Sequence, residues 1–191
     1  MSKSNSRHFS GTIGAKLSEY TLSTTSSLDT KPSESDIIAS RVKELDLRAH
    51  PTKHKQLSAK KMTLLRKKVQ ARTITRQEYK SYNSNRRLAR RRDQGKIEFW
   101  NQEKNRIQNG LTPSRKWTPE QMHDILHDRR PKQDGKTIQA HHTYSVSQYP
   151  HLANRGEVIF PATFREHLYG WHGGNFKNSL PGKPINKNKL R

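Results

Sequence analysis

Residues 136–178 read KTIQAHHTYSVSQYPHLANRGEVIFPATFREHLYGWHGGNFKN, and the order of elements in this stretch decides the fold that we predict. The stretch contains five of the ten histidines of the chain. His141 and His142 are adjacent and directly follow a short β-prone run that begins at Thr137. Glu157–Phe160 has the composition of a second short strand. These patterns predict a pair of strands, with two histidines at the end of the first.

The same stretch ends in a short helical pattern. Thr163 and Glu166 form a capping box, in which the hydroxyl and the carboxylate each accept from the backbone, so the helix should begin at Phe164. The helix carries His167 and His172 and stops at two glycines. Residues five apart lie about 140° apart around an ideal α-helix. For both histidines to face one point, the last turn must therefore widen or unwind.

The adjacent histidines indicate two different roles. Neighbouring residues on a strand point to opposite faces, so His141 and His142 cannot easily do the same job. One could bind a metal ion while the other takes a proton from water, because a neutral imidazole can do either near pH 7. The chain has no cysteine, so any metal ion must be held by histidine, carboxylate, asparagine or carbonyl oxygen. On motif grounds alone, histidines that are only satisfied polar side chains remain an alternative.

The bulk composition restricts the partners. The 191-residue chain carries a formal net charge of +22 and is only 29% hydrophobic, so it cannot bury a large core along its whole length. Such a charge predicts a polyanionic partner, with nucleic acid first and an anionic membrane surface second. No apolar run approaches the roughly 20 residues that cross a bilayer, so we expect no transmembrane segment. The N-terminus lacks the apolar region of a Sec-type signal peptide, so we expect synthesis in the cytoplasm.

The chain divides by composition into three parts. Residues 1–40 are rich in Ser and Thr, and we predict a disordered segment that is either a plain tail or a delivery segment. Residues 41–110 are dense in Lys and Arg with many helix formers, which predicts a basic helical region. Residues 111–191 contain the histidine stretch and should form the compact domain.

Capping residues define the helices of the basic region. Ser58 can cap a short helix. Thr75 and Glu78 form a capping box at the start of a long helix, which we predict over Arg76–Gln108, before the C-cap pair Asn109-Gly110. Its apolar residues are too few to cover it fully, so one side must face water or a partner.

A further capping box begins the helix before the histidine stretch. Thr118 is the N-cap and Pro119 suits the first helical position. His123 and His127 lie four residues apart on this helix, which is a spacing that metal ligands use. They are flanked by aspartates and lack a third ligand nearby in sequence, so we interpret them as part of an exposed face.

Five arginines within eight residues of the long helix form a candidate nucleic-acid contact. The planar guanidinium makes paired hydrogen bonds to phosphate, which suits this cluster to a nucleic-acid backbone. The alternative is a solvated helix face. The five are Arg86, Arg87, Arg90, Arg91 and Arg92.

The segments QAHHTYSVSQYPHLANRG and EHLYGWHGGNFKN resemble the HNH/endonuclease VII superfamily nuclease domains found at the C-termini of polymorphic bacterial toxins. The signature of those domains is GHH-like, and Ala140-His141-His142 stands in its place. The resemblance extends upstream to WTPEQMHDILHDRRP and covers about residues 117–186. It implies an α+β domain with a ββα-metal (His-Me finger) nuclease core.

The resemblance also implies roles for four histidines. His141 would be a metal ligand and His142 the general base, and His167 and His172 would be ligands supplied by the helix. The cofactor would be one divalent ion, namely Mg²⁺, Mn²⁺, Zn²⁺ or Ni²⁺. The spacing of the two helix histidines is i,i+5, where many such nucleases have i,i+4, and the middle asparagine of the HNH pattern has no clear match.

These patterns together favour a metal-dependent endonuclease that cuts DNA rather than RNA, with little sequence specificity. It would be an antibacterial toxin, delivered into the target-cell cytoplasm by a secretion or injection system and neutralised by a cognate immunity protein. One alternative is a basic nucleic-acid-binding protein without enzyme activity, which leaves the histidine order unexplained. A second alternative is an HNH nuclease of a phage or mobile element with no toxin role.

Overall fold

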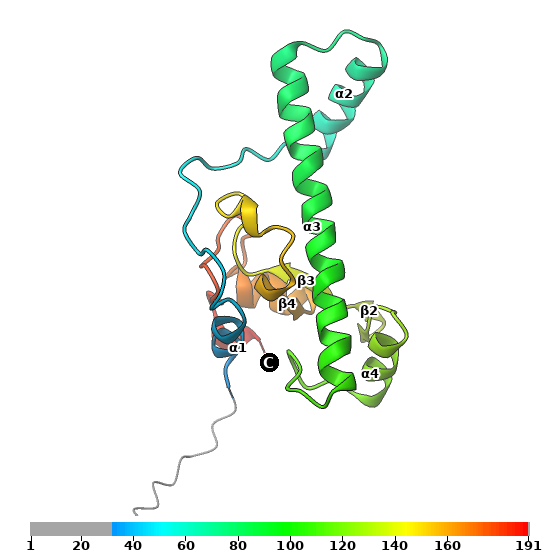
Figure 1. Ribbon diagram of the computed structural model, residues 1–191, viewed down its shortest axis with the longest axis vertical. Coiled ribbons are helices and arrows are strands. Elements are labelled where there is room, and N and C mark those ends of the chain that lie inside the picture. Colours follow the sequence, from blue (N-terminus) through cyan, green and yellow to red (C-terminus); the bar gives the residue numbers. More distant parts are fainter. Residues whose placement is uncertain (1–31, 191) are drawn as a thin grey trace, which may run out of the picture. The chain divides into compact units, whose positions relative to one another are not determined.

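The computed structural model describes residues 32–190. Four α-helices come first along this part of the chain: α1 (Glu34–Arg41), α2 (Ala59–Gln70), α3 (Arg76–Gln108) and α4 (Pro119–Leu126). Two antiparallel pairs of strands follow: β1 (Lys132–Gln133) with β2 (Lys136–Thr137), and β3 (Gln139–His142) with β4 (Ile159–Ala162). The remaining elements are one π-helix and three 3-10 turns: η3 (Glu166–Trp171), η1 (Pro150–Leu152), η2 (Gly156–Val158) and η4 (Lys187–Lys189). The α+β class is confirmed, and β3, β4 and the helix after β4 form a ββα unit (Figure 1).

The predicted capping residues begin the helices. Thr75 is the N-cap of α3, where its hydroxyl accepts from the Glu78 amide at 3.2 Å and its own amide donates to the Glu78 carboxylate at 3.2 Å. Thr118 and Gln121 begin α4 in the same manner, whereas α2 begins with a single bond, from the Lys61 amide to the Ser58 hydroxyl. Because caps satisfy backbone donors that no turn of the helix can satisfy, they fix helix starts from local sequence alone.

The strand after the histidine loop lies slightly later in the chain than predicted. We predicted Glu157–Phe160, whereas Gly156–Val158 forms a 3-10 turn and β4 spans Ile159–Ala162. All four residues of β4 are buried, so the strand contacts protein on both faces. A continuous apolar run therefore indicated this strand correctly but could not locate its first residue.

The predicted disordered segment is wrong at its C-terminal end. Residues 34–40 belong to α1, which begins at a capping box between Ser33 and Asp36. Ile38 on this helix is 1% exposed and packs in the main core. The rest of that prediction falls on residues 1–31, which lie outside the described part of the chain. A single buried isoleucine within a Ser-rich stretch gave too little periodicity to predict the helix.

The main core lies where α1, α3, β4 and η3 meet (Figure 1). Phe99 of α3 is fully buried, and such a side chain stabilises the fold by about 1.5–3 kcal/mol. The core also includes side chains from the loop between β3 and β4. Its buried members are Ile38, Val42, Phe99, Tyr144, Tyr149, Leu152, Val158, Ile159, Phe160, Ala162 and Trp171.

Two glycines let the loop between β3 and β4 lie directly against α3. A Cβ atom added at Gly95 would stand 2.5 Å from the carbonyl oxygen of Ala153. A Cβ atom added at Gly156 would stand 2.7 Å from the backbone nitrogen of Phe99. Glycine in a helix interior lowers helix stability by about 1 kcal/mol relative to alanine. At Gly95 this cost is offset by the close packing of the loop that the absence of a side chain allows. The loop is thereby fixed on α3, which matters for His142 below.

None of the helices in residues 32–190 is both long enough and apolar enough to cross a membrane. The 33-residue α3 has the length, but its sequence is rich in charged residues.

Candidate metal centre and active site

His141 and His142 lie on opposite faces of β3, as the alternation of a strand requires. In the register of the β3–β4 pair, His141 is opposite Phe160 and His142 is opposite Ile159. The His141 side chain is 6% exposed and packs against Trp171, with 4.9 Å between ring centroids. The His142 side chain instead reaches the loop, where its Nε2 lies 2.9 Å from the carbonyl oxygen of Ala153. The strand therefore separates the two imidazoles into two environments.

The helix after β4 widens into a π-helix at the two remaining histidines. The amide of His172 donates to the carbonyl of His167 at 3.2 Å, which is an i→i+5 bond. This bond closes the wider turn of η3 and brings residues five apart onto one side, with 4.9 Å between the two ring centroids. The sequence required such a widening if both rings were to face one point. Short π-helical turns occur frequently at functional sites.

Three histidines come together in one cluster. One ring nitrogen each from His141, His167 and His172 lies within 4.8 Å of the other two. Metal–nitrogen bonds of about 2.0–2.1 Å place ligand nitrogens about 3–4 Å apart, so small side-chain adjustments let this cluster hold one divalent ion. Within residues 32–190, no other group of three histidines or carboxylates lies close enough to do so. The donor set fits the cofactor that the sequence predicts.

Hydrogen bonds outside the cluster orient two of its rings. Nδ1 of His172 lies 2.5 Å from the carbonyl oxygen of Asn178, and Nδ1 of His167 lies 2.6 Å from the amide oxygen of Gln139. Because these oxygens only accept, each Nδ1 carries the proton and each Nε2 keeps its lone pair. Ligand histidines in metalloproteins are held in this manner. Sequence reasoning missed both partners, although Gln139 shares a strand face with His141 and could have been found from that spacing.

Burial keeps two imidazoles of the cluster neutral. It lowers the pKa of His141 well below the ordinary value, and the neighbouring His167 and His172 lower it further. Burial also lowers the pKa of His167 to about 4, with a smaller contribution from His172. Unprotonated imidazoles are the form that binds metal, so these two side chains are ready to bind at neutral pH.

His142 is held for a different task. Because the Ala153 carbonyl can only accept, Nε2 of His142 carries the proton and Nδ1 has the free lone pair. Burial lowers the pKa of His142 to about 4, the bond to Ala153 opposes that shift, and the charges of Arg92 and Lys96 on α3 add to it. The result is a neutral, oriented imidazole with one nitrogen free to accept a proton.

The five arginines of the predicted nucleic-acid contact do not share one environment. Four of them are exposed, while Arg92 is half-buried and close enough to His142 to affect its pKa. Arg91 donates to the carbonyl oxygen of His151 at 2.6 Å and to the side chain of Asn154 at 2.7 Å. Within residues 32–190, none of the five forms an ion pair with a carboxylate. The ion pairs of this region instead involve Arg48, Lys68, Lys96, Lys104, Arg106, Arg115, Arg129 and Arg155.

The other histidines near the site have structural contacts. His123 and His127 are exposed, and their rings stack with 4.2 Å between centroids. Neither belongs to the three-histidine cluster, which agrees with their interpretation as part of an exposed face. Nε2 of His151 lies 2.8 Å from the carbonyl oxygen of Asp46 and so joins the loop to the segment after α1.

A three-histidine cluster beside a separately held imidazole, on a ββα unit, is an arrangement suited to metal-assisted hydrolysis. A comparison with known families then identifies the chain more closely. Residues 82–163 match the family described as GHH signature containing HNH/Endo VII superfamily nuclease toxin. The resemblance predicted from the sequence is thus confirmed over this part of the chain. A search of curated proteins finds none that matches.

The extent of the match differs from our expectation. We predicted a resemblance from residue 117 onward, whereas the match begins within α3 at Tyr82. The matched region therefore includes most of the basic half of α3. The match includes His141, His142 and the Ala153 loop and ends at Thr163, before the two histidines of the helix.

Proposed function

We propose that this nuclease-toxin domain is a metal-dependent endonuclease that hydrolyses phosphodiester bonds. His142 is the general base, and His141, His167 and His172 hold one divalent metal ion. The observation that carries the proposal is the separation of the two roles by β3, with the cluster on one face and the oriented imidazole on the other.

Phosphodiester hydrolysis needs an activated water and stabilisation of charge on the phosphate and the leaving oxygen. His142 takes the proton of the attacking water at Nδ1, while its Nε2–H stays bonded to the Ala153 carbonyl. A phosphate group nearby raises the pKa of His142 from about 4 toward neutrality, since an anion favours the protonated form. When bound, the metal ion supplies Lewis-acid stabilisation of the phosphate and the leaving oxygen. Three imidazoles favour Zn²⁺ or Ni²⁺ for tight binding, and Mg²⁺ and Mn²⁺ are the other candidates for turnover.

The arginines of α3 bind the phosphate backbone of the substrate in this proposal. Their support is their charge, the exposure of four of them and their place at the start of the family match. Such contacts carry no sequence information, so we expect low sequence specificity. We propose DNA in preference to RNA as the substrate. The arginines concerned are Arg86, Arg87, Arg90, Arg91 and Arg92.

The family match supports a biological role as a toxin. A nuclease toxin harms the cell that contains it, so we propose an antibacterial effector that is delivered into a target-cell cytoplasm and is neutralised in the producing cell by a cognate immunity protein. A small gene next to that of this protein, whose product blocks the nuclease, would support this role over that of a phage or mobile-element nuclease.

A plasmid-nicking assay tests the activity. The full chain should nick supercoiled plasmid when a divalent ion is added and lose that activity in EDTA. An RNA of similar length, assayed in parallel, tests the substrate preference. Binding of plasmid without nicking under any of the four ions would instead favour a non-enzymatic nucleic-acid-binding protein, and cleavage that persists in EDTA would contradict the metal dependence.

A further inference from the structure

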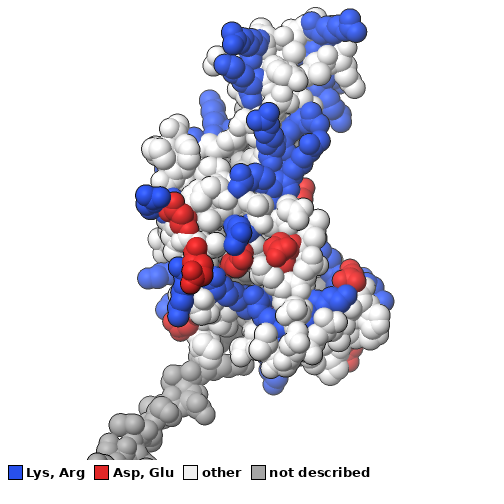
Figure 2. Space-filling view, viewed as in Figure 1, with Lys and Arg blue, Asp and Glu red and all other residues white. Residues whose placement is uncertain are grey.

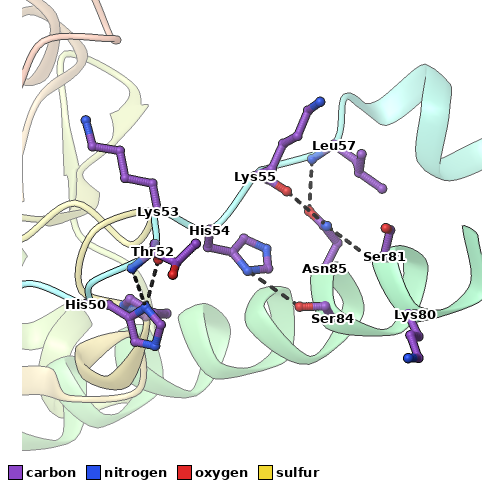
Figure 3. Close-up of a pocket in the computed structure, with 11 residues that line it drawn as sticks. His50, Thr52, Lys53, His54, Lys55, Leu57, Lys80, Ser81, Ser84 and Asn85 are labelled. Atoms are coloured by element: carbon purple, nitrogen blue, oxygen red, sulfur yellow. Dashed lines mark hydrogen bonds between the residues drawn. The ribbon is translucent and has the colours of Figure 1, made fainter. Parts of the chain in front are cut away.

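A groove lies between α3 and the extended segment His50–Leu57, far along α3 from its C-terminal end. The amides of His50 and His54 donate to the carbonyls of Gln148 and Ser147 at 2.7 and 2.8 Å. At the other end, the amide of Leu57 donates to the side chain of Asn85 on α3 at 2.9 Å. Figure 3 shows this segment and α3 with the Asn85 amide joining them. The segment is therefore pinned at both ends, and the groove that it borders is a formed feature.

The groove is continuous along the helix. Its largest part is a cavity of about 480 Å³. Two adjoining hollows of about 280 and 300 Å³ share lining residues with that cavity, including Ser84 of α3. Together they follow α3 from Tyr79 to Arg91 and end at His151. We call this feature the basic groove.

The lining of the basic groove is cationic. No aspartate or glutamate is among its lining residues. Residues 51–92 contain fifteen Lys or Arg and a single acidic residue, Glu78. Figure 2 shows Lys and Arg gathered over α2 and the first half of α3, where few acidic side chains are visible. The basic lining side chains are Lys53, Lys55, Lys80, Arg87 and Arg91, together with His50, His54 and His151.

Helical spacing aligns the contribution of α3. Lys80, Ser84, Arg87 and Arg91 are separated by four, three and four residues, so they lie along one stripe of the helix. The distance from Tyr79 to Arg91 is about 18 Å at 1.5 Å per residue. A duplex advances about 3.4 Å per base pair along its axis, so the groove is as long as roughly five base pairs.

The basic groove ends at the loop that orients His142. Arg91 donates to the carbonyl of His151 and to the side chain of Asn154. Ala153, which lies between these two residues, supplies the carbonyl that accepts from His142. A strand that follows the groove toward His151 therefore arrives at the loop beside the proposed base.

We propose that the basic groove binds the phosphate backbone of the nucleic-acid strand that enters the histidine site. This inference rests on the proposed function and adds to it the segment His50–Leu57, which the arginine cluster does not include. An acidic protein partner is the competing occupant. The lining favours nucleic acid, because Leu57, Leu88, Tyr79 and Pro150 are its only apolar or aromatic side chains, whereas protein interfaces rely on buried aromatic anchors.

The test measures binding apart from cleavage. Full-length protein carrying His142→Ala is titrated in EDTA with a fluorescein-labelled DNA duplex of 20 base pairs at several salt concentrations. Lys53→Ala with Lys80→Ala removes two charges from the groove. Lys132→Ala with Lys136→Ala removes two charges from exposed residues of the β1–β2 hairpin and is the matched control. Thermal unfolding followed by circular dichroism verifies that all variants remain folded.

We expect Lys53→Ala with Lys80→Ala, the groove pair, to reduce the steepness of the plot of log K against log salt by about 1.8. This is about 0.9 for each phosphate that is no longer neutralised by a lysine. Lys132→Ala with Lys136→Ala, the hairpin pair, should leave the slope unchanged. Equal reductions in both pairs would show an effect of net charge alone and overturn the proposal. Unchanged DNA binding together with abolished binding of poly-L-glutamate would assign the groove to an acidic protein and also overturn it. A wild-type protein that never cleaves, but whose DNA binding depends on the groove pair, would refute the nuclease proposal and leave the groove proposal standing.

Discussion

The histidine core and the basic arm, which we define as residues 58–92, are stabilised in opposite ways. Around the histidine core, β4 is completely buried and His141 and His172 are 6% and 9% exposed. In the basic arm, Leu65 is the one buried residue of α2, and only Tyr82 and Leu88 are buried within the first half of α3. The core is organised by packing, whereas the arm is organised by helix caps and exposes most of its side chains.

The difference corresponds to the two roles that we propose for these regions. The base and the metal site that we propose need imidazoles that are oriented and fixed, and burial with hydrogen bonds to Ala153, Gln139 and Asn178 achieves this. The phosphate-binding surface that we propose needs positive charges on a long scaffold. A capped helix provides such a scaffold with few buried side chains. Changes in the core should therefore alter chemistry, and changes in the arm should alter affinity.

The largest expected effects separate the two roles within the core. His142→Ala should keep metal affinity and lose about 10²–10⁴-fold in turnover, because water is no longer deprotonated. The variants His141→Ala and His167→Ala should lose both metal binding and turnover. They should also lose the stabilisation that a bound ion gives to the folded state. Calorimetric metal titration beside plasmid nicking measures both properties. Loss of metal binding in His142→Ala with full retention in His141→Ala would reverse the assignment.

The His172→Ala variant tests whether His172 is the third metal ligand. If the π-helical turn holds His172 at the metal ion, this variant should match His167→Ala in the titration. A wild-type titration curve would mean that the third ligand is a different group.

The next effect concerns the C-terminal end of α3, where a buried carboxylate joins it to the core. Glu103 is fully buried and accepts from the amide and hydroxyl of Ser114, from Trp117 Nε1 and from Arg106. Glu103→Gln removes the charge and turns an NH₂ group toward other donors. This change should lower the free energy of unfolding by about 3 kcal/mol. We expect the melting temperature to fall by about 6–12 °C. The control is Glu44→Gln, at an exposed position, which should leave it unchanged.

A smaller effect should appear where the arm joins the core at Gly95. Alanine here places Cβ 2.5 Å from the Ala153 carbonyl oxygen, so the loop must move and the bond to His142 must lengthen. We expect Gly95→Ala to lower kcat about 10–100-fold, since a misplaced general base retains part of its effect, with unchanged metal affinity. The exposed neighbour provides the control Gln94→Ala. An unaltered kcat in Gly95→Ala would show that the loop does not position the base.

The sequence predicted the arm better than the details of the site, for a physical reason. A cap such as Thr75 with Glu78 acts within four residues, so the start of α3 could be predicted to the residue. The role of Ala153 depends on a backbone carbonyl, and any residue type supplies one. The acceptor of His172 is likewise a backbone carbonyl, that of Asn178. No residue pattern marks such groups.

Long-range contacts explain the remaining differences. Glu103 gave no signal because its donors Ser114 and Trp117 lie 11–14 residues away, beyond the helix. Gly95 is identifiable as unusual within a helix, but only the folded structure shows that it faces Ala153. The last turn of the helix after β4 is the exception, because the i,i+5 spacing of the two histidines predicted that it must widen or unwind, and it widens into a π-helix.

The smallest expected effect lies at the start of α3, where the arm depends on a few polar groups. Glu78 closes the capping box with Thr75 and also accepts from Lys68 of α2 at 2.6 Å. Thr75→Ala should lower the free energy of unfolding by about 1 kcal/mol and speed amide hydrogen exchange in the first turn of α3. The control is Thr73→Ala, at an exposed position, which should change neither quantity. Metal binding should be unaffected, because the arm and the core are stabilised separately.

The same cap predicts a pH dependence that distinguishes it from the core. The hydrogen bond from Lys68 and then that from the Thr75 backbone lower the pKa of Glu78 below its ordinary value of 4.5. A lowered folded-state pKa means that the contribution of Glu78 is complete above pH 4.5 and is lost as the pH falls through the folded value. The measurement is amide hydrogen exchange in the first turn of α3, corrected for its intrinsic pH dependence. In the Glu78→Gln variant this exchange should be fast at every pH. In the wild-type protein it should become equally fast only in acid. Protection in the wild type that is constant from pH 6 down to pH 3 would show that the cap does not hold the arm.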